Sequence, residues 1–203
     1  MREEDFFDVL QSRRSVRAFA DRLPDRALLD RLIEAARWAP SNHNRQGWKF
    51  LVFQDRAQIR ALSQRVRQSL GDALASANRL LAAQGQELLH FATVFEKAPV
   101  IILALHKKSP AIGRALVGAG DGTRISGEAL STAMAVQNIL LAAHVLGLGA
   151  CAMTAPLLAS DVWRAIPDLP AGFEPTCLVA VGYPAEQPAP PRRKPVEHIV
   201  EYR

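Results

Sequence analysis

Residues 125–147, ISGEALSTAMAVQNILLAAHVLG, form a helix-like stretch that is apolar on almost every side. At helical spacing its apolar side chains cover more than one stripe; they are Ala129, Leu130, Met134, Val136, Ile139, Leu140, Leu141, Val145 and Leu146. Polar residues interrupt the run too often for a transmembrane span; they are Glu128, Ser131, Gln137, Asn138 and His144. A helix that is hydrophobic all round must be buried all round, so we expect a second subunit to cover part of it. The alternative is a central core helix in a monomer.

Other apolar runs predict the partners of this helix. Runs at residues 49–53, 99–106 and 176–183 read as strands, and the second does not alternate with polar residues, so it is expected to be buried on both faces. Residues 24–38 carry apolar side chains at helical spacing. Pro24 and Pro40 suit the start and end of that helix.

The remaining segments complete a single-domain prediction. Residues 56–95 are rich in helix formers, with Gly71 and Gly85 as expected breaks, and residues 107–124 read as a glycine-containing loop. Residues 184–203 are proline-rich and basic, which predicts an extended tail able to wrap another surface. Because neither a repeat nor a linker is visible, residues 1–203 are expected to form one α+β domain with layers around one sheet.

Charge and cysteine content limit the classes of function. The net charge is +5 and the isoelectric point is near 9.7, which could indicate nucleic-acid binding. However, the basic residues are scattered, and no aromatic-plus-basic or helix-turn-helix pattern accompanies them. Cys151 and Cys177 are too far apart for a Cys-x-x-Cys motif, and the charged N-terminus lacks a signal-type apolar run. These features favour a reducing cytoplasm.

Three polar segments concentrate the candidate chemistry: SRRSVRAF at 12–19, APSNHNRQGW at 39–48 and PRRKP at 191–195. Guanidinium groups bind phosphate in bidentate fashion, and a serine hydroxyl adds a donor. In an extended chain side chains alternate, so Arg13, Ser15 and Arg17 would share one face. The simpler interpretations are a solvated basic patch for the first segment and a solvated loop for the second.

Together, these three segments resemble the nitroreductase family of FMN-dependent flavoproteins. The matching motifs are RRSVRAF, the loop pattern Ala-Pro-Ser, Asn-x-Gln and Trp, the long helix followed by GLGACAMTAP, and the closing GYPAEQPAPPRRKPVEHIV. The resemblance covers nearly the whole chain. It implies a three-layer α+β fold, with a central, mainly antiparallel sheet flanked by helices, in an intertwined homodimer that holds FMN at its interface.

The resemblance also implies how the FMN phosphate is held. Arg13 and Ser15 would bind it together with Arg192 and Lys194 from the tail, while Arg14 would contribute mainly backbone contacts. A phosphate monoester carries about −1.5 to −2 charges at neutral pH, so several cations around it are expected.

The rest of the cofactor is assigned in the same way. Arg17 would lie at the pyrimidine edge of the flavin, near N1 and O2, and backbone groups of Thr154 and Ala155 would approach N5. The polar loop of the other subunit would grip the ribityl chain and the ring edge, through Ser41, Asn42 and Asn44.

Several positions depart from the family pattern. Gly47 stands where proline is usual, and Thr154 stands where some members carry Glu. Residues 87–95, ELLHFATVF, lack a clear counterpart of an Asn and a Lys found there in some members, and no role is assigned to His90 and Thr93. Residues 56–95 and 107–126 match least, and this is where such proteins build their substrate-covering elements.

The activity implied is transfer of hydride from NADH or NADPH, through flavin N5, to a small electron-poor acceptor such as a nitroaromatic or a quinone. The cofactor carries this chemistry, so no side-chain acid is nominated. No metal site is expected, because the five histidines lack ligand spacing. The alternatives are another flavin reaction, namely dehydrogenation, dehalogenation or flavin fragmentation, or a basic nucleic-acid-binding protein without FMN. GAGDGTR, at 118–124, resembles a phosphate loop only weakly.

Overall fold

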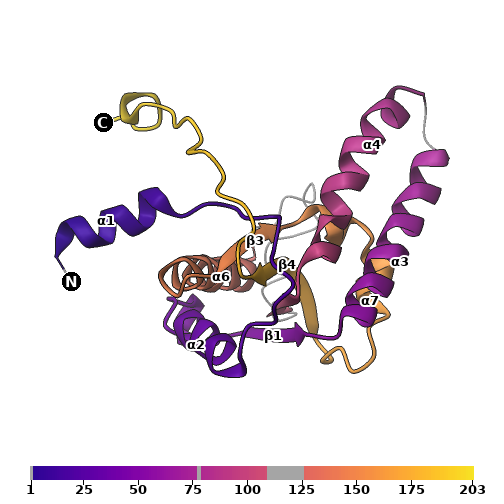
Figure 1. Ribbon diagram of the computed structural model, residues 1–203, viewed down its shortest axis with the longest axis horizontal. Helices are drawn as coiled ribbons and strands as arrows, with labels where there is room; N and C mark the ends of the chain where they lie inside the picture. Colours follow the sequence, from indigo (N-terminus) through magenta and orange to yellow (C-terminus); the bar gives the residue numbers. More distant parts are fainter. Residues whose placement is uncertain (1, 77–78, 109–125) are drawn as a thin grey trace.

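A four-stranded antiparallel sheet forms the middle of the molecule (Figure 1). The computed structural model describes residues 2–76, 79–108 and 126–203. The strands are β1 (Trp48–Phe53), β2 (Val100–Lys107), β3 (Gly149–Met153) and β4 (Phe173–Gly182). Their order across the sheet is β1-β2-β4-β3, and every neighbouring pair is antiparallel. The predicted α+β class and its antiparallel sheet are therefore confirmed.

Helices cover both faces of this sheet. One face carries α2 (Arg26–Arg37) and α6 (Gly127–Val145), and the other carries α3 (Arg56–Ala75), α4 (Arg79–Thr93) and α7 (Ser160–Arg164). The predicted two-sided burial of β2 explains the three layers. Ile101, Leu103 and Leu105 pack into the core of the second face. The residues between them pack into the core of the first; they are Val100, Ile102 and Ala104.

Helix α6 is only partly buried within one chain. Ala135, Ile139 and Ala143 are fully buried against the sheet and α2. In contrast, Leu130 remains 52% exposed and Val145 64% exposed. The core of a single chain thus leaves part of this apolar helix uncovered, which argues against a fully buried core helix in a monomer.

Both ends of the chain reach away from the body. Helix α1 (Glu3–Ser12), which the sequence patterns did not predict, contains no buried residue, and Phe6, Phe7 and Leu10 lie exposed on it. The C-terminal tail is extended as predicted, apart from the short 3-10 turn η4 (Val196–His198). Figure 1 shows α1 and the tail on the side opposite to the α3–α4 pair.

The helix breaks expected at Gly71 and Gly85 are wrong. Both residues lie inside helices, α3 and α4 respectively, and the first helix ends at Ala75. A helical glycine costs only about 0.5–1 kcal/mol relative to alanine, so it does not force a break. At Gly85 a Cβ atom would lie 2.8 Å from Leu74 Cδ1 of α3, so the missing side chain allows the two helices to approach closely. The predicted loop at 107–124 lies largely outside the described residues, including its GAGDGTR motif.

Candidate functional site

The N-terminal arginine segment, residues 13–18, runs beside the edge strand β3. The chain leaves α1 after Ser12 and becomes extended, and Ser15 forms a parallel bridge with Ala150. The backbone N–H of Val16 donates to the Ala150 carbonyl at 3.1 Å. The Val16 side chain is buried, and a Cβ atom on Gly149 would lie 2.7 Å from Val16 Cγ1. The segment therefore lies so close to the strand that only glycine fits at that position.

The thiol of Cys151, in the neighbouring strand β3, is influenced by three predicted phosphate and flavin ligands. Burial raises the pKa of Cys151, while the charges of Arg17 and Arg13 and a hydrogen bond with Ser15 oppose the rise. Arg13, Ser15 and Arg17 thus all influence this thiol, while their shared face stays a prediction. Arg14 turns away, because its guanidinium donates to the carbonyls of Gln11 at 2.6 Å and Arg13 at 2.8 Å.

A small cavity lies at the end of β3, beside this segment. Its volume is about 170 Å³, and its lining brings together Arg17 with Thr154 and Ala155, three residues predicted to contact the flavin. Phe91 and Val94, from the end of α4 and the turn η2 (Val94–Lys97), form an apolar wall with Ala152 and Met153. The cavity therefore combines one cation, the backbone at the end of a strand, and an apolar surface.

The polar loop, residues 41–46, has a left-handed backbone at three residues. The φ angles of His43, Asn44 and Gln46 are 50°, 52° and 49°. Asn and His are enriched among residues with such angles, whereas Gln is uncommon there. Such conformations cost about 1–3 kcal/mol each and persist only where the surroundings hold them. The loop therefore has a defined backbone shape, while its residues 42–46 are exposed to solvent in this chain.

Hydrogen bonds within the loop and to α6 hold this shape. The Ser41 hydroxyl accepts the Gln46 N–H at 3.0 Å, and the backbone N–H of Asn42 donates to Ser131 Oγ of α6 at 3.0 Å. Arg45 pairs with the buried Glu128 at 3.3 Å, in the first turn of the same helix. Several of the polar side chains therefore serve the loop itself, in addition to any ligand.

Within one chain, the polar loop lies far from the small cavity. It precedes β1, at one edge of the sheet, whereas Thr154 and Ala155 follow β3, at the other edge. Three strand spacings separate these edges, roughly 14 Å. Arg192 and Lys194 lie exposed in the projecting tail. A single chain thus places Arg17 with Thr154 and Ala155 around one cavity, with Arg13 and Ser15 in the same extended segment as Arg17. The other predicted ligands lie apart from this cavity, and the contacts of all these residues with FMN stay a prediction.

Comparison with known proteins identifies the family. A model of the nitroreductase family matches residues 10–183 of the 203-residue chain. The chain belongs to the nitroreductase family. The NADH dehydrogenase of Thermus thermophilus is 31% identical to this nitroreductase-family chain over 194 residues, which cover 94% of the chain and 92% of that protein.

Solved structures share the nitroreductase-type fold. A BluB-like flavoprotein from Clostridium difficile 630 superimposes with a TM-score of 0.83 at 24% identity, covering 97% of this chain and 98% of that one. Oxidised iodotyrosine deiodinase, bound to FMN and 3-iodo-L-tyrosine, superimposes with a TM-score of 0.72 at 24% identity, with the same coverage. These likenesses confirm the three-layer fold that the resemblance implied.

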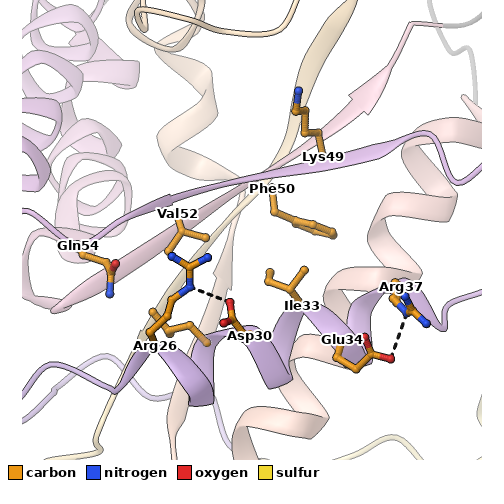
Figure 2. A pocket seen from close by; sticks show the side chains of 10 residues that line it. Arg26, Asp30, Ile33, Glu34, Arg37, Lys49, Phe50, Val52 and Gln54 are labelled. Carbon is orange, nitrogen blue, oxygen red and sulfur yellow. Dashed lines mark hydrogen bonds and ion pairs between the residues drawn. The ribbon is translucent and has the colours of Figure 1, made fainter.

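A larger cavity of this nitroreductase-family protein carries none of the predicted ligands. It has a volume of about 580 Å³ and lies between α2 and β1, and Figure 2 shows its lining. Its charged side chains are largely paired with one another: Arg26 with Asp30 at 2.8 Å, and Arg37 with Glu34 at 3.1 Å. Between these pairs the lining is apolar, so cavity size alone does not locate the site.

Thr93, to which the family resemblance assigned no role, ties α4 to α3. It is buried, and its hydroxyl accepts from Arg67 Nη2 at 2.8 Å and donates to the Leu89 carbonyl at 2.7 Å. Its own carbonyl accepts from Ser63 Oγ at 3.3 Å. Thr93 therefore anchors the helix that carries the wall residue Phe91.

His90, the other residue without an assigned role, also contacts this wall residue. Its ring lies 5.4 Å from that of Phe91, edge to face.

Two further predictions, that the chain holds no metal site and no membrane span, can be compared with the described residues only. Within the ranges 2–76, 79–108 and 126–203, no group of three or more His, Cys, Asp or Glu side chains is placed to hold a metal ion. In the same ranges, no helix is both long enough and apolar enough to cross a membrane.

Proposed function

We propose that this protein is an FMN-dependent oxidoreductase that reduces small electron-poor acceptors, such as nitroaromatics or quinones, with NADH or NADPH. Bound FMN would supply the redox chemistry, by accepting hydride at N5 and passing the reducing equivalents to the acceptor in a ping-pong sequence. The observation that carries the proposal is the small cavity where Arg17 meets Thr154 and Ala155.

The residues around this cavity fit FMN in their chemistry. Arg13 and Ser15 belong to the segment that pairs with β3, and they offer charged and hydroxyl donors suited to a phosphate. Arg17 offers a fixed cation for the pyrimidine edge of the ring, where reduction places negative charge. The backbone of Thr154 and Ala155 would face N5. The apolar wall made by Phe91, Val94 and Met153 suits a flat aromatic ring.

We further propose that the active unit is a homodimer of this single domain. The exposed apolar side chains of α1 and α6 offer a large surface for a second copy. That copy would supply Ser41, Asn42 and Asn44 to the ribityl chain and the ring edge. The projecting tail would add Arg192 and Lys194 at the phosphate. A cytoplasmic location is consistent with the two cysteines, both free and buried.

Absorption and turnover test this function directly. The purified protein should show flavin absorption bands and should oxidise NADH or NADPH when a nitroaromatic, a quinone or free flavin is added. Turnover of a halogenated tyrosine instead would select the dehalogenation alternative within the family. A colourless protein that binds DNA in a salt-sensitive way would overturn the flavoenzyme proposal.

A further inference from the structure

The segment after Arg17 and the chain after β4 are joined by a short run of backbone hydrogen bonds, and a carboxylate of the tail stands at its end. After β4 the chain pairs with the segment that follows Arg17: Ala20 N–H donates to the Tyr183 carbonyl at 2.8 Å, and Phe19 bridges Pro184. Ala185 N–H donates to the Ala18 carbonyl at 3.0 Å. At the end of this run stands Glu186. Its Oε1 accepts the backbone N–H groups of Arg17 at 2.5 Å and of Ala18 at 2.9 Å.

This carboxylate completes the support of the arginine segment. On one side, Val16 is held by the Ala150 carbonyl of β3. On the other, Ala18 and Ala20 are held by the backbone of residues 183–185. Arg17 lies between these two supports, and its backbone N–H is held by the side chain of Glu186. The orientation of Arg17, whose side chain lines the small cavity, therefore depends on a group 169 positions later in the chain.

The charge of Glu186 agrees with this geometry. Its backbone hydrogen bonds with Arg17 and Ala18 lower the pKa of the carboxyl below its usual range, and the charges of Arg17 and Lys97 act in the same direction. The carboxylate is thus ionised at neutral pH, and a charged acceptor forms stronger hydrogen bonds than a neutral one. Because it is exposed to solvent, its effect is expected to be moderate.

We infer that Glu186 is a positioning residue, which fixes the Arg17–Ala18 backbone so that the Arg17 side chain lies in the cavity beside Thr154 and Ala155. The inference rests on the proposed function, in which Arg17 acts at the flavin. It adds a residue outside the predicted ligands, because Glu186 supports the site through the backbone of Arg17.

Amide exchange and flavin properties test this role together. In Glu186→Ala the amides of Arg17 and Ala18 should exchange faster, and FMN affinity should fall about three- to tenfold. The two-electron potential should also fall, because Arg17 would no longer be held at the ring edge. Glu186→Gln retains an accepting oxygen and should recover most of the affinity. Glu197→Ala, a change at an exposed residue of η4, serves as the matched control and should change neither quantity.

Failure of the proposed function and failure of the inference on Glu186 give different results. A flavin-free wild-type protein would overturn the proposed function, and with it the role of Arg17. A flavin-loaded Glu186→Ala protein with wild-type affinity and potential would overturn the inference alone, whether or not amide exchange has changed. If Glu186→Ala does not fold, Glu186→Asp and Glu186→Gln decide. The shorter carboxylate should lose protection and affinity while the amide keeps them, and equal behaviour of the two would overturn the inference.

Discussion

The arginine segment and the polar loop present polar groups in two physically different ways. The arginine segment, residues 13–18, is extended and held by backbone hydrogen bonds to β3 and by the Glu186 carboxylate. Alternation along an extended chain predicts that Arg13, Ser15 and Arg17 share one face. The polar loop, residues 41–46, has a left-handed backbone at three residues, and it is tied to α6 by the hydrogen bond from the Asn42 backbone N–H to Ser131 and by the ion pair of Arg45 with Glu128.

This difference between the arginine segment and the polar loop indicates which part of the site a single chain can form. The arginine segment already meets Thr154 and Ala155 around a cavity within its own chain. The polar loop also has a defined shape, but it lies at the opposite edge of the sheet. A loop with a strained backbone, tied to α6 yet away from the cavity of its own chain, is what we expect of a group that serves a second copy. The predictions below test this division.

Deletion of the tail from Pro190 onward should have the largest effect. It removes Arg192 and Lys194, and charge-assisted hydrogen bonds are worth roughly 1.5–3 kcal/mol each. Loss of even one such bond should weaken FMN binding by about tenfold or more, as measured by fluorescence titration. A shorter deletion, of residues 200–203, keeps both cations and serves as the control. Unchanged affinity in the longer deletion would mean that the arginine segment holds the phosphate without the tail.

The charge of Arg17 should affect the reduction potential of the flavin more than the affinity of the protein for FMN. Two-electron reduction tends to leave negative charge at N1, and a nearby cation stabilises the reduced form. Arg17→Gln should therefore retain FMN but lower its two-electron potential. A loss of about 1.5–3 kcal/mol corresponds to roughly 30–65 mV.

Dye-equilibration titration of both proteins at one pH gives this shift. Arg22→Gln removes a cation that stacks on Tyr183 and is the control. If the potential stays at the wild-type value while flavin binding is intact, Arg17 does not lie at the ring edge, and the arginine segment is only a solvated basic patch.

Local patterns in the sequence predicted the layers but not the supports of the site. The apolar run of β2 implied burial on both faces, and the alternation of an extended chain implied the shared face of the arginine segment. Glu186 carried no local signal, because its role arises only when residues 183–185 pair with residues 18–20. The left-handed backbone at Gln46 was not predictable from the sequence either, since glutamine is uncommon in that region.

The helix breaks and the N-terminal helix also show that local sequence patterns do not predict features set by tertiary contacts. The glycines at 71 and 85 suggested breaks, but the packing of α3 against α4 outweighs a weak propensity. Helix α1 buries nothing in its own chain, and its charged start did not indicate a helix. Local signals are thus weakest where tertiary contacts, or contacts with a second copy, decide the structure.

Two glycines allow the two halves of the site to be tested by the same substitution. At Gly149 an added Cβ would lie 2.7 Å from Val16 Cγ1 and 2.8 Å from its Cβ. Val16 is buried, and its β-branched side chain has few alternative rotamers. Gly149→Ala should therefore push the arginine segment away from β3 and destabilise the protein by about 1–3 kcal/mol. Chemical denaturation measures the loss, and FMN affinity should fall with it. A variant as stable as wild type would show that the segment lies less firmly on β3 than its contacts indicate.

Gly127→Ala, the counterpart at the polar loop, should have the smallest effect. An added Cβ would lie 2.9 Å from Asn42 Nδ2 and 3.2 Å from its Cγ, at the far end of an exposed and flexible side chain. The Asn42 side chain can rotate away, and Gly127 is the first residue of α6, where the preference for alanine in a helix interior does not apply in full. The free energy of unfolding should thus change by less than about 0.5 kcal/mol. FMN affinity should still fall slightly in the dimer, because Asn42 is displaced. A loss of stability as large as that of Gly149→Ala would contradict this expectation. The loop would then be as rigid as the arginine segment, and packing against α6 rather than side-chain hydrogen bonds would hold its strained backbone.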